Sequence, residues 1–204
     1  MARMAVTERR AALIQAALRV IAADGVAAAT TRAITAEAGM SLASFHYAFR
    51  SRDELIAELI PYVVEHESLA AEQTLAPGHD LHTTVKNAME AFVELVAADP
   101  AREQAMFELS LYALRTEELH EAAKAQYASY YKAAEALVEA AAQLTGRTWS
   151  RPASEIARIV VTLTDGLTLG WLVHRDRTAT QPIIDFAANA IAALADPLDT
   201  PEPA

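Results

Sequence analysis

The sequence predicts an all-α fold of about nine helices, with a small N-terminal helical head and a larger C-terminal helical bundle. Hydrophobic residues make up 53% of the 204 residues and only 6 are glycine, which is typical of a packed globular chain. Alanine, the residue with the highest helix propensity, recurs throughout. Apolar residues also recur three and four positions apart in one segment after another, which is the helical period.

The composition excludes several classes of site. The sequence contains no cysteine, so disulfides, cysteine nucleophiles and zinc–cysteine sites are excluded. It contains no uninterrupted run of about 18 apolar residues, and residues 1–10 lack the apolar core of a signal peptide. We therefore expect a soluble cytoplasmic protein without a membrane partner.

Charge is distributed unevenly along the chain. Residues 1–52 carry seven arginines against three acidic residues, a net charge of +4, whereas residues 53–204 carry 10 basic and 24 acidic residues, a net charge of −14. A basic end attached to an acidic body would be oriented on DNA, because the phosphates attract the basic end and repel the acidic body. The acidic residues also keep an alanine-rich bundle soluble, and the two interpretations are compatible.

The first helix is expected over residues 7–23. Its apolar positions, from Leu13 to Ile21, follow the helical spacing, with Thr7 as the N-cap and Gly25 just beyond its end. This helix would brace the two short helices that follow it.

Two short helices separated by a tight turn are expected next. Ile34 and Ala38 are one helical turn apart, and Gly39 supplies the left-handed residue that ends a helix at low cost. Ser41 is placed to cap the following helix. A helix, a glycine-containing turn and a second helix form the helix-turn-helix arrangement, whose second helix enters a DNA major groove.

The second of these short helices has an inner and an outer side. Phe45 and Phe49 lie four residues apart, so both can point inward. Leu42 is expected near the buried side. The outer side is small, polar and aromatic, which suits a base edge better than a protein core. The residues expected to read bases there are Ala43, Ser44, His46 and Tyr47.

At these positions the sequence resembles the signature of TetR-type (tetracycline-repressor-like) transcriptional regulators. The resemblance is dense, covers about the first quarter of the chain, and rests on Gly25, Thr30, Ile34, Ala38, Gly39, Ser41, Phe45, Phe49 and the run from Ser51 to Leu55. His46 stands where the family commonly has a phosphate-contacting tyrosine, so either His46 or the neighbouring Tyr47 contacts phosphate. Arg52 stands where the family commonly has lysine. The resemblance implies a DNA-binding domain at residues 1–52 and an effector-binding and dimerisation domain at residues 53–204.

Phosphate contacts are expected at two helix starts. Thr31 and Arg32 open the second helix, and a capping box from Ser51 to Glu54 opens the fourth. Arginines near the first helix reach the DNA backbone or stay in solvent, with about equal weight: Arg3, Arg9 and Arg10. The full set of expected DNA contacts is Thr31, Arg32, Ser41, Ala43, Ser44, His46, Tyr47, Arg50 and Arg52.

The remaining helices follow from caps and breaks. The fourth, over residues 55–75 and interrupted by Pro61, would link head and body as a lever. Further helices are expected over residues 81–98 (capped by Asp80), 100–115 (capped by Asp99), 116–144, 153–174, and after Thr180; residues 146–152 form a break. His79, Asp80 and His82 are interpreted as a surface cluster, so no metal site is expected.

The last two helices carry broad apolar surfaces that need a partner. The resemblance implies that the same pair from a second subunit completes a four-helix dimer interface, although the subunit's own bundle can bury part of this surface. Gly166 and Gly170 lie four apart and allow close approach. The residues expected at the interface are Ile159, Leu163, Gly166, Leu167, Gly170, Ile183, Phe186, Ala187, Ala190, Ile191 and Leu194.

The body is also expected to bind a small molecule, because aromatic residues with polar tips come from several of its helices. Asp165 is the most informative, since it interrupts an apolar run and its carboxylate needs a partner. A cationic or hydroxylated ligand is one such partner, and Thr162 or an arginine from a neighbouring helix is an equal alternative. The expected ligand-binding residues are Tyr62, Met89, Phe92, Met106, Phe107, Tyr127, Tyr131, Asp165 and Trp171. Each of them alone is more often an ordinary core residue.

These expectations combine into one hypothesis: the protein is a homodimeric transcriptional regulator, and we expect a repressor. It would bind double-stranded DNA at a palindromic operator and be released by an unidentified small-molecule effector. No GxSxG, HExxH or phosphate-cradling glycine loop occurs, so neither an enzyme nor a cofactor is expected. The alternative is an all-α small-molecule carrier, or a small enzyme, with a vestigial helix-turn-helix head.

Overall fold

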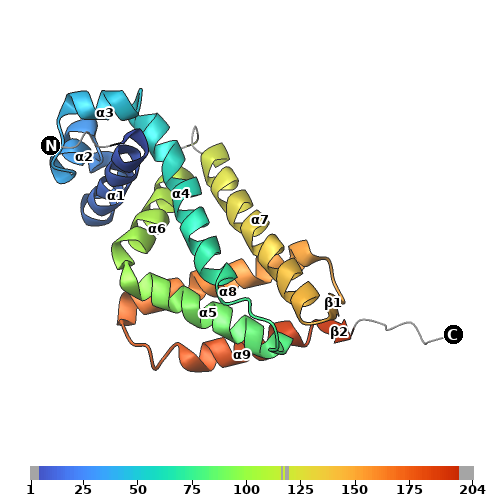
Figure 1. Cartoon of the computed structure of the whole chain (residues 1–204). Helices are drawn as coiled ribbons and strands as arrows, with labels where there is room; N and C mark the ends of the chain where they lie inside the picture. Colours follow the sequence, from blue (N-terminus) through green and yellow to red (C-terminus); the bar gives the residue numbers. More distant parts are fainter. Residues whose placement is uncertain (1–4, 116, 118–119, 198–204) are drawn as a thin grey trace. The chain divides into compact units, whose positions relative to one another are not determined.

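The computed structural model describes residues 5–115, 117 and 120–197 and confirms the all-α fold (Figure 1). Within these residues there are nine α-helices, one 3₁₀ helix and a two-stranded sheet. In chain order they are α1 (Val6–Asp24), η1 (Val26–Ala28), α2 (Thr31–Glu37), α3 (Leu42–Ala48), α4 (Arg52–Glu72), α5 (Leu81–Ala98), α6 (Pro100–Leu114), α7 (His120–Leu144), β1 (Arg147–Trp149), α8 (Ala153–His174), α9 (Gln181–Ala192) and β2 (Ala195–Pro197).

The helices form two packing units. The first consists of Met1–Val63 and Asp99–Tyr127, and the second of Val64–Ala98 and Ala128–Ala204. The first unit extends beyond residue 52 because α6, which is distant in sequence, packs against α1. The division by packing therefore differs from the functional boundary expected after residue 52, which stays a prediction.

The first unit is organised around α1. Leu13, Ala17 and Ile21 are fully buried, as their helical spacing predicts. The N-cap lies two residues earlier than predicted: Ala5 is the N-cap and its N–H donates to the Glu8 carboxylate (3.1 Å). The prediction of Thr7 as the N-cap is therefore wrong.

Caps and a glycine set the limits of the short helices; the roles of Gly39 and Ser41 were predicted, whereas the cap by Thr30 was not. The Thr30 hydroxyl accepts a hydrogen bond from the Ala33 N–H (3.1 Å) at the start of α2. Gly39 has φ 63°, the left-handed conformation that L side chains rarely adopt. The Ser41 hydroxyl then accepts from the Ser44 N–H (3.2 Å) and opens α3.

Acidic caps also begin α5 and α6. Asp80 accepts from the Thr83 N–H (2.8 Å). A hydrogen bond from the Thr83 hydroxyl, together with this one from the N–H, holds the pKa of the Asp80 carboxyl below its usual value. Asp99 accepts from the Arg102 N–H (3.2 Å). Both caps were predicted. The predicted start of the seventh helix, at residue 116, lies outside the described residues.

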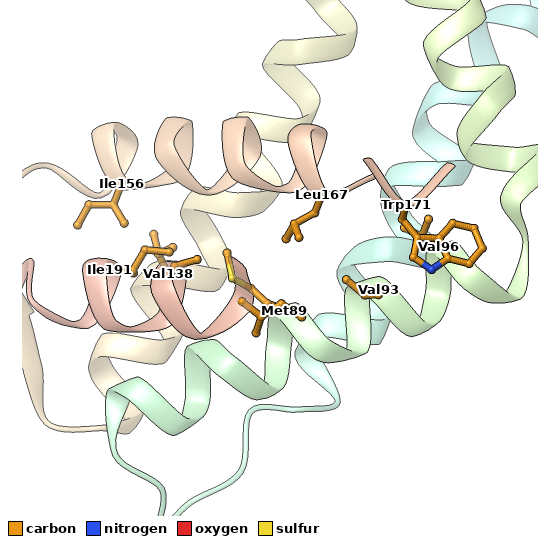
Figure 2. Close-up of a cluster of buried hydrophobic side chains, with 10 residues drawn as sticks. Met89, Val93, Val96, Val138, Ile156, Leu167, Trp171 and Ile191 are labelled. Atoms are coloured by element: carbon orange, nitrogen blue, oxygen red, sulfur yellow. The ribbon is translucent and has the colours of Figure 1, made fainter. Parts of the chain in front are cut away.

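The second unit has its core where α5, α8 and α9 pack together (Figure 2). Lys86 of α5 and Asp185 of α9 form an ion pair (2.7 Å) at the edge of this packing. The buried cluster consists of Met89, Val93, Val96, Val138, Ile156, Leu167, Trp171, Ile184, Ala187 and Ile191. Three of the residues expected at a dimer interface are thus core residues of this subunit.

The break before α8 contains a strand that the sequence did not reveal. β1 pairs antiparallel with β2, with Thr148 opposite Asp196. Trp149 Nε1 donates to the Val138 carbonyl (3.1 Å), and the Ser150 N–H donates to the Leu194 carbonyl (2.9 Å). These contacts tie the end of the described chain to the turn between α7 and α8.

Candidate nucleic-acid interface

The outward face of α3 is the centre of the candidate site. Phe45, Ala48 and Phe49 are buried, which leaves the opposite side of this short helix to solvent. Tyr47 is 55% exposed. Ala43 and His46 are exposed as well. The side of α3 that carries Ala43, His46 and Tyr47 faces solvent, as predicted.

Leu42 corrects the sequence analysis. It was expected near the buried side, but it is 42% exposed. It lies four residues before His46, so the two side chains form one row on the helix surface, and Ala43 and Tyr47 form the adjacent row. Phe45 fills the space beneath α3, and Leu42 is left on the outer side.

Ser41 and Ser44 have local roles. Their hydroxyls lie 3.1 Å apart, and Ser41 caps the Ser44 N–H. Ser41 is exposed and Ser44 is half-buried. Their expected contacts with DNA stay predictions.

Arg10 fastens α1 to α3 and α4. Its guanidinium carbon lies 4.1 Å from the centroid of the Phe49 ring. It donates to the Ala48 carbonyl at the end of α3, and to the Glu58 carboxylate of α4, with Nε at 3.2 Å from Oε2. Arg10, weighed above as a DNA contact, therefore has an internal positioning role; Arg3 lies outside the described residues.

Arg9 lies against the exposed aromatic ring of α3. Its guanidinium carbon is 5.0 Å from the centroid of Tyr47, a cation–π distance. The contact brings a positive charge to the outward face.

Arg52 is placed differently from a free phosphate ligand. Nε donates to the Ala29 carbonyl (2.7 Å) and Nη2 to the Val26 carbonyl (2.6 Å). The guanidinium thereby joins the start of α4 to the turn before α2. This geometry gives Arg52 a positioning role, and its phosphate contact stays a prediction.

Arg50 and Arg32 are the exposed cations among the expected contacts. The Arg50 side chain is 96% exposed, with Nε 3.8 Å from Glu54. Arg32 is exposed and Thr31 half-buried at the start of α2. The contacts of Thr31, Arg32 and Arg50 with DNA phosphates stay predictions.

Glu54 completes the junction between α3 and α4. Its N–H donates to the Ser51 hydroxyl (3.1 Å), which is one half of the predicted capping box. Its carboxylate accepts from the Arg50 N–H (2.8 Å), one residue before the N–H that the other half of the box requires. This hydrogen bond, assisted by the Arg10 guanidinium, holds the pKa of the Glu54 carboxyl below its usual value.

The expected ligand-binding residues are divided between the two packing units. Tyr62, Met106, Phe107 and Tyr127 belong to the first unit, and Met89, Phe92, Tyr131, Asp165 and Trp171 belong to the second. In the first unit Met106 is buried, and the Tyr62 hydroxyl accepts from Gln15 Nε2 (3.1 Å). Phe107 and Tyr127 are half-buried.

In the second unit Trp171 is the most informative of these residues. It is 8% exposed, and its Nε1 has no hydrogen-bond partner among the described residues. The Arg175 guanidinium carbon lies 4.6 Å from its ring centroid. Met89 is buried in the same cluster and Phe92 packs against it, whereas Asp165 and Tyr131 are half-buried.

The expected dimer residues separate into three groups by exposure. Those exposed on α8 and α9 are Ile159, Gly166, Gly170, Ile183, Phe186 and Ala190, while Leu163 and Leu194 are half-buried. Leu167, Ala187 and Ile191 are buried in the subunit's own core, and their expected contact with a second subunit stays a prediction.

Two exposed residues of the same surface were missed, Leu169 and Val173. A Cβ on Gly166 or Gly170 would meet no atom of the described chain within 4 Å. We call the exposed residues Ile159, Gly166, Leu169, Gly170, Val173, Ile183, Phe186 and Ala190 the α8–α9 face.

Among the described helices, α8 alone is long and apolar enough to cross a membrane by length and composition. Core helices of soluble proteins share this length and composition.

Comparison with known proteins identifies relatives over most of the chain. The sequence model described as "Bacterial regulatory proteins, tetR family" matches residues 13–59, and that described as "Tetracyclin repressor-like, C-terminal domain" matches residues 81–198. The chain is 29% identical over 188 residues to the HTH-type nicotine-responsive transcriptional repressor HdnoR of Paenarthrobacter nicotinovorans, covering 92% of this chain and 96% of that protein.

Solved structures share the fold. A transcriptional regulator from Rhodococcus sp. Rha1 superposes with a TM-score of 0.68 at 20% identity, covering 92% of this chain and 97% of that one. A TetR transcription regulator from Haloarcula marismortui superposes with a TM-score of 0.69 at 18% identity, covering 93% and 100% of the two chains.

Proposed function

Because this chain belongs to the TetR family of bacterial regulatory proteins, we propose that it is a homodimeric repressor that binds a palindromic operator and releases it when a small molecule binds. In this proposal residues 1–52 form the DNA-binding domain and residues 53–204 the effector-binding and dimerisation domain. The observation that carries the proposal is the solvent-facing side of α3, with Tyr47 55% exposed over a buried Phe45.

Charge supports contact of the head with DNA. The net charge of residues 1–52 is +4, against −14 for the remainder. Arg32 and Arg50 are exposed close in sequence to α3. Contacts with phosphate fix the register of a protein on the duplex, while the side chains of α3 read the bases.

The α8–α9 face supports the dimer. Its large apolar side chains, with Phe186 67% exposed, lie beside two glycines that allow close helix approach. A soluble protein rarely leaves such a patch uncovered. A two-fold dimer places two recognition helices about 34–36 Å apart, one turn of the duplex, and therefore selects a palindrome.

The indole N–H of Trp171, which has no hydrogen-bond partner in the described part of the chain, supports an effector site in the second unit. A buried donor without a partner costs free energy, and a ligand acceptor would remove that cost. The relative described as nicotine-responsive makes nicotine a suitable first probe. Nicotine carries a pyridine nitrogen that can accept such a hydrogen bond and an amine that is cationic at neutral pH, which suits aromatic residues and the half-buried Asp165.

The effector acts by shifting a population. A ligand releases DNA only to the extent that it binds the non-DNA conformation more tightly, and a ligand indifferent to the two states shifts nothing. In our proposal the shift reaches the heads through α4, whose start Arg52 ties to the turn before α2. A change in the spacing of the heads then lowers operator affinity.

DNA binding at several salt concentrations tests the proposal. We expect the full-length protein to bind duplexes selected from a random pool, with an affinity that falls steeply between about 50 and 200 mM salt. Tyr47→Ala should weaken binding without changing the dimer, and Arg50→Ala should lower the salt dependence. Arg151→Ala, an exposed arginine of the second unit, is the control. A carrier or an enzyme with a vestigial head would show neither sequence preference nor salt-dependent binding, and that result would refute the proposal.

A further inference from the structure

The outward face of α3 carries an aliphatic side chain at its first position. Leu42 is 42% exposed and shares a row with His46, beside the row of Ala43 and Tyr47. Exposing a leucine at this position brings no benefit to the folded monomer, because burial of its side chain would be favourable. A partner that meets the α3 face therefore gains by covering it.

The chemistry of this face is unusual for base recognition. The seven residues of α3, LASFHYA, include no arginine, lysine, asparagine or glutamine. Those four side chains make the bidentate contacts that distinguish guanine and adenine in the major groove. Apolar side chains instead distinguish thymine, through its 5-methyl group. Two of the four outward residues, Leu42 and Ala43, are aliphatic.

We propose that Leu42, assisted by Ala43, recognises thymine 5-methyl groups in each half of the operator. This inference rests on the proposed DNA binding and specifies its ligand: half-sites in which thymine occupies the positions opposite Leu42 and Ala43. The net charge of +4 in residues 1–52 attracts the duplex, and the methyl contacts contribute the sequence preference at these positions.

Replacement of thymine by deoxyuridine tests the proposal, since deoxyuridine keeps the base pair and lacks only the methyl group. Duplexes are first selected from a random pool with the full-length protein, and each recurrent thymine is then replaced in turn. Each methyl removed opposite Leu42 should weaken binding about fourfold, because the burial of one methyl group in the complex is lost. Symmetric replacement in both half-sites should weaken it about sixteenfold.

Variants assign the effect to Leu42. At the thymine position opposite Leu42, replacement by deoxyuridine should leave the affinity of the Leu42→Ala variant nearly unchanged. Leu111→Ala removes a leucine of similar exposure, 52%, from α6 in the same packing unit, and it should keep the full preference for thymine. Melting curves confirm that both variants are folded.

The outcomes separate this inference from the proposed function. If the wild-type protein selects a sequence but is insensitive to deoxyuridine at every position, or if Leu42→Ala keeps the wild-type preference, the methyl inference is wrong and DNA binding stands. If no duplex is selected and binding shows no salt dependence, the proposed function itself fails.

Discussion

Gln104 of α6 donates a hydrogen bond of 2.8 Å from Nε2 to the main-chain carbonyl of Ala22 in the last turn of α1. On the same helix, Glu108 Oε1 would lie 3.3 Å from a Cβ placed on Gly25. A helix from the predicted effector-binding part of the sequence thus contacts the main chain at the end of the first head helix. Because α1 packs against α3, α6 is placed to influence the α3 face that we propose contacts DNA.

Replacing Gln104 with alanine tests this connection. Loss of one exposed hydrogen bond should lower the stability by about 0.5–1.5 kcal/mol. We also expect the ratio of operator Kd values with and without effector to fall by a factor that corresponds to about 0.5–2 kcal/mol of coupling. Fluorescence anisotropy of a labelled operator measures both Kd values. Gln143→Ala, at an exposed position of α7, is the control, and an unchanged ratio for Gln104→Ala would exclude α6 as a route.

Arg52 acts either as a positioning residue or as a phosphate ligand, and the two roles predict different effects of its replacement. Its two hydrogen bonds to the carbonyls of Val26 and Ala29 are charge-assisted, each with an expected value of about 1.5–3 kcal/mol. Arg52→Ala should therefore lower the Tm clearly, whereas Arg50→Ala, at a 96% exposed side chain, should change the stability by less than about 0.5 kcal/mol. Thermal unfolding measures both. An Arg52→Ala protein with the wild-type Tm and weakened DNA binding would favour the phosphate contact instead.

Glu54 should make the stability of the head depend on acidity. Hydrogen bonds from the Arg50 N–H and Arg10 lower its pKa in the folded protein below the ordinary value of about 4.5. A carboxyl with a lowered pKa stabilises the fold above its unfolded-state pKa, and this contribution disappears as the pH falls through the folded-state pKa. The difference in Tm between the wild type and Glu54→Gln should thus be largest near neutral pH and vanish in strong acid.

Asp53→Asn is the control for this pH series, because it removes a neighbouring exposed carboxyl at the start of α4. A difference between the wild type and Glu54→Gln that stays constant from neutral pH to strong acid would contradict the assigned role of Glu54.

Phe186 should be essential for dimerisation. It is 67% exposed on α9, and a carboxylate in its place would be desolvated in the proposed interface. Phe186→Glu should weaken the dimer by about 2 kcal/mol or more, which sedimentation velocity detects as a monomer at micromolar concentration. Operator affinity should fall with it, since the two heads are no longer joined. Leu111→Glu places the same charge at an exposed leucine of α6 and should stay dimeric; a dimeric Phe186→Glu would count against the α8–α9 face.

The two tryptophans of the second unit give a matched test of effector binding. Trp149 Nε1 donates to the Val138 carbonyl (3.1 Å), whereas Trp171 Nε1 has no partner among the described residues. Trp171→Phe should weaken binding of the effector, with nicotine as the first probe, by about 0.5–1.5 kcal/mol in calorimetry. Trp149→Phe should lower the Tm and keep the affinity. The reverse pattern would place the effector elsewhere.

Local chemistry allowed much of the head to be predicted from the sequence. The hydroxyl of Ser41 caps α3, and Gly39 adopts the left-handed conformation between α2 and α3. Each of these features depends on residues within one helical turn. The spacing of Phe45 and Phe49 then determined which side of α3 faces outward, and both side chains are buried.

Contacts between distant residues could not be predicted in this way. Arg52 binds carbonyls 23 and 26 residues earlier, and β1 pairs with a strand after α9. Leu42 is exposed because Phe45 and Phe49 occupy the space beneath α3. None of these outcomes leaves a periodic signal in the sequence.

The helices α8 and α9 show most clearly what the sequence determines and what only tertiary packing decides. Helical periodicity showed by itself that both helices carry broad apolar surfaces, and it placed Leu167 and Phe186 together on the surface expected to form the dimer. Only the packing of α5 against them decided that Leu167 is buried in the core and Phe186 is left in solvent. The physical reason is that hydrophobicity determines how much surface a helix must bury, while the position of its neighbours in space determines which side is already covered.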